Sequence, residues 1–112
     1  MAEKIALASS DGLFVNEHFA QASVFYIYEN SGDKFGFLEK RVCRCPGGHD
    51  TKSIDAILLL LSDCTAIFVN RIGPGAARYL IEKGVRVFDA PYPIETVLVQ
   101  VNKKNLLTDR KE

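Results

Sequence analysis

The stretch Lys4-Ile-Ala-Leu-Ala-Ser-Ser-Asp-Gly12 joins a short apolar run to a polar turn. An apolar run of strand length that ends at turn-forming residues is typical of a strand buried inside a sheet. We therefore predict that residues 4–8 form the first strand, and that the other elements are arranged on both sides of it.

A hairpin is predicted after this strand. Residues 23–29 are dense in aromatic and β-branched side chains, and residues 35–42 form a second strand-like run. Asn30-Ser31-Gly32-Asp33 between them is a strong turn signal. The two runs are therefore expected to be antiparallel second and third strands, with the third exposed at a sheet edge where another subunit could pair.

The second half of the chain predicts alternating helices and strands. The first helix is indicated by an apolar stripe at the i, i+3, i+4 and i+7 spacing, preceded by residues that favour an N-cap. The stripe is Ile54, Ile57, Leu58 and Leu61, and the candidate N-caps are Asp50, Thr51 and Ser53. A buried fourth strand is predicted over residues 66–69 and a fifth over residues 85–88.

Two more helices are predicted, one after each of these strands. Pro74 near the start and Gly84 just past the end indicate a helix over residues 73–83. The last helix begins at Pro93, and residues 102–112 after it form a polar tail. The apolar stripe of that helix is Ile94, Val97, Leu98 and Val101.

This order of elements predicts a single α/β domain over residues 1–112, with three layers and a mixed five-stranded sheet of order 3-2-1-4-5. Right-handed crossovers make the first, fourth and fifth strands parallel neighbours, and the hairpin extends the other side with strand 2 antiparallel. The loops after strands 1, 3, 4 and 5 then leave from one edge of the sheet, the one formed by the carboxyl ends of its parallel strands. That edge holds the topological switch point between strands 1 and 4, where open α/β sheets bind ligands.

Bulk composition limits the classes of partner. Lys plus Arg and Asp plus Glu number 14 each, so the chain lacks the basic field that attracts nucleic acid. No apolar run approaches the roughly 18 residues of a membrane span, and no secretory signal is recognised. A cytoplasmic location without nucleic-acid or membrane partners is predicted. There, the 3 cysteines are expected to be thiols or metal ligands.

Both histidines and two of the cysteines lie in predicted loops. In Val15-Asn-Glu-His-Phe19, the apolar ends are expected to pack inward and leave the His18 imidazole free to bind a metal or to act as an acid or base. Cys43, Cys45 and His49 share a second loop and are ligand types that suit iron-sulfur clusters and zinc. Their spacing lacks the second ligand pair of a zinc finger, and a loop with incidental thiols is the alternative.

Other polar groups are expected at the same edge. Ile72-Gly-Pro-Gly-Ala76 is similar to the start of an anion-binding helix, although a tight turn is an equally good interpretation. Residues 9–11, Ser-Ser-Asp, should face the same crevice, without the motif of a serine hydrolase. Cys64 is expected at the opposite edge as a small core residue. The candidate cofactor-binding residues are His18, Ser10, Arg71, Gly73 and Gly75.

Six segments together resemble the dinitrogenase iron-molybdenum cofactor-binding family, over about residues 4–101. They are residues 4–12, Val-Asn-Glu-His-Phe (15–19), Phe-Tyr-Ile-Tyr-Glu (25–29), Ser-Asp-Cys-Thr-Ala (62–66), Ile-Gly-Pro-Gly-Ala (72–76) and Gly-Val-Arg-Val-Phe (84–88). The resemblance implies a ribonuclease H-like fold and a carrier of the nitrogenase cofactor or its iron-sulfur precursor. It implies that His18 is a cluster ligand, and that Cys43, Cys45 and His49 are a possible second donor set. Relatives usually have Gly where this chain has Ala20.

Three functions follow as hypotheses. The first is a non-catalytic carrier that binds an anionic metal-sulfur cluster and delivers it to cofactor-assembly proteins or apo-dinitrogenase. Its metal ligands would be His18, Cys43, Cys45 and His49. The second is a divalent-metal-dependent phosphoryl-transfer enzyme, which is disfavoured because residues 5–8 contain no Asp or Glu. The third is a protein-protein interaction module without metal.

Overall fold

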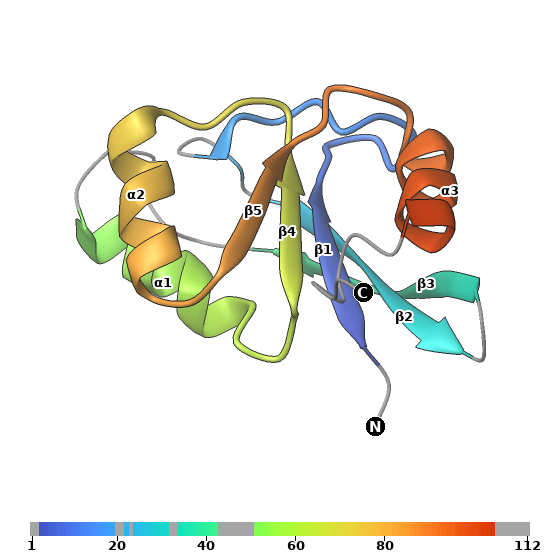
Figure 1. The fold of residues 1–112 in the computed structure, drawn as a ribbon, viewed down its shortest axis with the longest axis horizontal. Coiled ribbons are helices and arrows are strands. Elements are labelled where there is room, and N and C mark those ends of the chain that lie inside the picture. Colours follow the sequence, from blue (N-terminus) through green and yellow to red (C-terminus); the bar gives the residue numbers. More distant parts are fainter. Residues whose placement is uncertain (1–2, 20–21, 23, 32–33, 43–50, 105–112) are drawn as a thin grey trace.

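The computed structural model describes residues 3–19, 22, 24–31, 34–42 and 51–104. Three strands come first, followed by helices that alternate with two more strands (Figure 1). The elements are β1 (Lys4–Ala8), β2 (Val24–Ser31), β3 (Lys34–Val42), α1 (Thr51–Leu60), β4 (Ala66–Val69), α2 (Pro74–Glu82), β5 (Arg86–Asp89) and α3 (Ile94–Lys104). This order of strands and helices confirms the prediction.

The five strands form one mixed sheet in the order β3-β2-β1-β4-β5. β4 is parallel to β1 and to β5, whereas β2 is antiparallel to both of its neighbours. The predicted strand order 3-2-1-4-5 is therefore confirmed, with β1 at the centre (Figure 1). α2 connects the parallel strands β4 and β5, and the longer connection from β1 to β4 passes through the hairpin and α1, as a crossover connection requires.

Alternate residues of β1 serve two separate cores, which explains why this strand is a continuous apolar run. Ala6 and Ala8 belong to the core beneath α1 and α2, whereas Ile5 and Leu7 belong to the core beneath α3. All four side chains are fully buried. The sheet is thus the middle layer of three, and the loops at the ends of its central strands are the natural place for a site.

The ends of the helices differ slightly from the predictions. α1 begins at Thr51, so Ser53 lies inside the helix and is not the N-cap, while Asp50 lies outside the described residues. α2 runs from Pro74 to Glu82, one residue shorter at each end than the predicted 73–83, and the chain leaves it at Gly84, where φ is +81°. α3 begins one residue later than predicted, at Ile94. None of the described helices is long and apolar enough to cross a membrane.

Candidate functional site

The loop after β1 returns to the sheet and inserts between β1 and β4. Pairing of these two strands ends at Leu7 and Phe68. Just beyond, the Glu17 N–H donates to the Ala8 carbonyl at 3.3 Å, and the Asn70 N–H donates to the Glu17 carbonyl at 2.9 Å. The loop therefore occupies the topological switch point of the sheet, the position at which open α/β sheets bind ligands.

His18 lies at the centre of this inserted segment. It is paired with Arg71 in a parallel β-bridge, and the Phe19 N–H donates to the Arg71 carbonyl at 3.0 Å. Phe19 and Val15 are buried, as predicted, in the cores beneath α1 and α2 and beneath α3 respectively. Val15 and Phe19 are four residues apart and lie in different cores, so the segment between them is not a regular strand, and His18 takes the exposed position just before Phe19. Both His18 and Arg71 are exposed.

Residues 9–14, which directly follow β1, form a turn that is held by several internal hydrogen bonds. The Ser9 hydroxyl donates to the Asp11 carboxylate at 3.1 Å and accepts the Gly12 N–H at 2.9 Å. The same carboxylate accepts the N–H groups of Leu13 and Phe14, which hold the pKa of Asp11 below its usual value. The expectation that Ser9 faces the crevice is wrong, because Ser9 is fully buried and stabilises this turn.

Ser10 remains exposed on the same loop. Its N–H donates to the Asn16 side-chain oxygen at 3.0 Å, and the Asn16 amide donates to the Ser10 hydroxyl at 3.1 Å. These two bonds tie the beginning of the loop to the residue two positions before His18. A hydroxyl that accepts a hydrogen bond still has its own proton to donate, so Ser10 can contribute to a ligand site.

The start of α2 lies two residues beyond Arg71. Gly73 is the N-cap and has no side chain that could cap the helix, and Pro74 at the first position has no N–H. A Cβ placed on Gly73 or Gly75 would meet no atom within 4 Å. Because internal packing does not require glycine at these two positions, their main chain is open to a ligand. The first turn of a helix favours negative charge.

The predicted donors Cys43, Cys45 and His49 lie outside the described residues. The strand that leads to them, β3, ends at Val42, which pairs with Val24. The Val24 carbonyl accepts the Ser9 N–H at 3.2 Å, directly after β1. The described part of the chain thus brings His18, Arg71 and the start of α2 to one edge, and contains no group of three or more His, Cys, Asp or Glu residues that could hold a metal ion.

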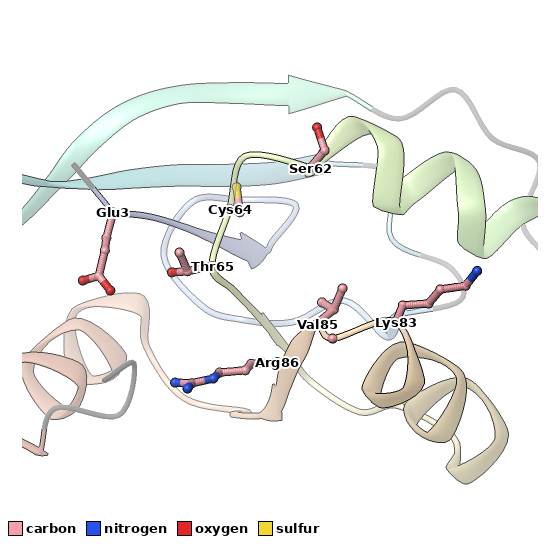
Figure 2. A pocket seen from close by; sticks show the side chains of 8 residues that line it. Glu3, Ser62, Cys64, Thr65, Lys83, Val85 and Arg86 are labelled. Carbon is pink, nitrogen blue, oxygen red and sulfur yellow. The ribbon is translucent and has the colours of Figure 1, made fainter. Parts of the chain in front are cut away.

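Cys64 lies at the opposite edge, as predicted. It lines a polar cavity of about 460 Å³ at the amino ends of the parallel strands (Figure 2). The cavity is lined by Glu3, Ser62, Cys64, Thr65, Lys83, Gly84, Val85 and Arg86. Burial, with a smaller effect of the Asp63 charge, raises the pKa of the Cys64 thiol to about 12. The thiol is therefore protonated at neutral pH when no metal is bound.

A charge cluster near Cys64 was not predicted from the sequence. The Arg41 guanidinium donates to both carboxylate oxygens of Asp63, at 2.7 and 2.9 Å, and to the Leu60 carbonyl at 3.0 Å. These bonds tie the end of β3 to the turn after α1. They hold the pKa of Asp63 well below its usual range. The two residues are 22 positions apart, a spacing that gives no signal in the sequence.

Fold and candidate site together define a small α/β domain with one exposed imidazole beside a guanidinium and a helix start at the switch point of its sheet. Residues 1–104 match the family described as dinitrogenase iron-molybdenum cofactor. The chain belongs to this family.

Curated relatives include proteins of nitrogenase cofactor biosynthesis. The FeMo cofactor biosynthesis protein NifB of Frankia alni is 30% identical over 113 residues, which cover 95% of this chain and 22% of NifB. Protein NifX of Klebsiella pneumoniae is 31% identical over 88 residues, which cover 79% of this chain and 56% of NifX. The chain therefore spans about a fifth of this NifB and about half of NifX.

Solved structures share the fold at low sequence identity. The crystal structure of PH0822 has a TM-score of 0.70 and 16% identity, and covers 90% of this chain and 91% of that one. A crystal structure from Methanocaldococcus jannaschii, MJ0327, has a TM-score of 0.62 and 11% identity, with 93% and 91% covered. These similarities support the mixed sheet and its helices.

Proposed function

We propose that this chain binds and delivers a metal-sulfur cluster, either the iron-molybdenum cofactor or its iron-sulfur precursor, without catalysing a reaction on it. The observation that carries the proposal is His18, which backbone hydrogen bonds hold at the switch point of the sheet while its imidazole is exposed. The family and the printed names of NifB and NifX support a cluster as the ligand.

The chemistry of the edge suits an anionic cluster. A neutral imidazole nitrogen can bind iron or molybdenum. The guanidinium of Arg71 would offset the negative charge of the cluster, together with the N–H groups at the start of α2. Cys43, Cys45 and His49 would supply further ligands. A carrier benefits from few protein ligands, because each one must be released when the cluster is delivered.

The remaining expectations belong to the same proposal. The partners would be cofactor-assembly proteins or apo-dinitrogenase, and delivery would take place in the cytoplasm. The mixed sheet with strand order β3-β2-β1-β4-β5 also supports membership of the ribonuclease H-like class of folds.

Anaerobic reconstitution tests the proposal. Purified chain is mixed with iron-molybdenum cofactor extracted from dinitrogenase, or with an iron-sulfur cluster donor, and then desalted. Iron, molybdenum and visible absorbance are measured in the protein fraction. We expect loading of the wild type, and a loss of at least about tenfold in His18→Ala, the equivalent of one charge-assisted or ligand bond.

Two additions make this experiment decisive. Free imidazole added to His18→Ala should restore part of the loading, because it replaces the missing ligand without changing the chain. Cys43→Ser with Cys45→Ser, measured in parallel, tests the second donor set. Full loading of His18→Ala would contradict the role of His18, and an absence of iron and molybdenum from the wild type would contradict the proposed function.

A further inference from the structure

Asn70 is the first residue after β4 and is half-buried. It makes two hydrogen bonds to the loop that carries His18. Its backbone N–H donates to the Glu17 carbonyl at 2.9 Å, and its side-chain Nδ2 donates to the Val15 carbonyl at 3.2 Å. The two bonded carbonyls are two residues apart and lie just before His18.

This pair of bonds acts as an extension of the sheet. Along an extended segment, alternate carbonyls point to the same side, where a neighbouring strand would satisfy them. One of the two donors here is a side-chain amide, so the interaction depends on the residue type at position 70. The side chains of Asp and Ala have no N–H to donate, so neither residue can make this contact.

The register of this loop decides which side chain reaches solvent. The hydrogen bonds of Asn70 to Glu17 and Val15 fix which residue of the loop is paired with Arg71, and that residue is His18. A slip of the loop along the chain after β4 would place another residue beside Arg71 and would displace Phe19 from the core in which it is buried. The correct register is therefore a condition for any function of His18.

We propose that Asn70 is the positioning residue of the site, which fixes the register of residues 15–19 and thereby presents the His18 imidazole beside Arg71. Its importance for cluster binding rests on the proposed function. Its effect on the loop does not, because the two hydrogen bonds are present in the chain without a cluster.

The test compares Asn70→Ala with a matched control, Thr65→Val. The Thr65 hydroxyl donates to the Lys4 carbonyl at 3.2 Å, at the other end of β4. Each variant therefore loses one side-chain bond to a backbone carbonyl from a neighbouring segment, but only Asn70→Ala loses it at the His18 loop. Asn70→Asp keeps the shape of the side chain without the donor and is measured in the same way, so that the result does not depend on one variant folding.

The first measurement is hydrogen exchange of the Phe19 amide in the metal-free protein, followed by NMR. This amide bonds to the Arg71 carbonyl and reports the pairing of the loop with the chain after β4. We expect exchange to be about three to ten times faster in both Asn70 variants, the range for the loss of one hydrogen bond, and unchanged in Thr65→Val. Unchanged exchange in the Asn70 variants would overturn the inference.

The second measurement is loading with extracted iron-molybdenum cofactor, as above. We expect at least about a threefold loss in the Asn70 variants and none in Thr65→Val. An equal loss in Thr65→Val would assign the effect to general destabilisation and overturn the inference. If Phe19 exchange is faster in the Asn70 variants but the wild type takes up no cofactor, the positioning role is supported and the proposed function is contradicted.

Discussion

His18 and Arg71 are partners in a parallel β-bridge beyond the end of β4, and both side chains are exposed. The pairing is made by the main chain, since the Phe19 N–H donates to the Arg71 carbonyl. It therefore brings an imidazole and a guanidinium together without a direct bond between the two side chains. One group can bind a metal and the other provides a permanent positive charge.

Removing the charge at Arg71 should lower the affinity for the cluster and should also make that affinity less dependent on salt. We expect Arg71→Gln to lower the affinity for an anionic cluster by about three- to tenfold at low ionic strength, and less at high salt, because exposed charges are screened. Anaerobic titration at two salt concentrations measures both effects. Lys34→Gln, which removes an exposed positive charge at the start of β3, should leave the affinity unchanged. An equal loss of affinity in both variants would show that only the net charge of the chain, and not the position of Arg71, affects cluster binding.

Gly75→Ala tests whether the start of α2 contacts the cluster. The added Cβ meets nothing within 4 Å, so the fold should accept it, and the free energy of unfolding should rise by up to about 1 kcal/mol because Ala favours helix more than Gly. Cluster loading should fall if a ligand approaches the main chain there. Gly36→Ala, another position where a Cβ meets no atom within 4 Å, is the control. Higher stability with full loading would place the cluster away from α2.

Patterns of apolar residues predicted the fold because burial depends on side-chain type. The run Ile5–Ala8 and the stripes of the helices each identified a buried face, and the order of elements then left few possible topologies. The inward packing of Val15 and Phe19 was predicted on the same basis.

The details of the site depend on interactions that residue types do not reveal. Main-chain bonds of Glu17 insert the loop between β1 and β4, and they would be the same for almost any side chain. Ser9 is polar and was expected in the crevice, yet its hydroxyl is bonded inside a buried turn. The contact of Asn70 with Val15 joins residues 55 positions apart, which no local pattern could indicate.

Gly12→Ala should destabilise the turn formed by residues 9–14. Gly12 has a φ of +77°, and a Cβ there would lie 2.9 Å from Cε2 of Tyr26. Left-handed backbone and this steric overlap together should lower the free energy of unfolding by about 1–3 kcal/mol, measured by urea denaturation. Tyr26→Leu removes the overlap and also the ring contact of Tyr26 with Phe37, so Gly12→Ala should cost less in a Tyr26→Leu background than in the wild type. A Gly12→Ala variant as stable as the wild type would show that the turn adapts freely.

Asp63→Asn should alter the dependence of stability on pH. The Arg41 guanidinium beside Asp63 holds the pKa of that carboxyl below its usual value of 3.8 in the folded state. A carboxyl with a lowered pKa contributes stability above its unfolded pKa, and this contribution is lost as pH falls toward the folded pKa. The wild type should therefore be more stable than Asp63→Asn at pH 7, and the gap should narrow steadily below about pH 4. Urea denaturation across this range measures it.

Arg41→Gln tests whether the ion pair causes this difference in stability between the wild type and Asp63→Asn. If the ion pair is the cause, Asp63→Asn should cost less in the Arg41→Gln background than in the wild type, because the charge that lowers the pKa of Asp63 is already absent. Part of the effect should persist, since Lys4 also approaches Asp63, at 3.5 Å. Asp63 is well exposed, so solvent weakens the pair, and the difference should shrink in high salt. A gap that is independent of pH and unaffected by Arg41→Gln would contradict the role of the ion pair, and the lowered pKa of Asp63 would then contribute nothing measurable to folding.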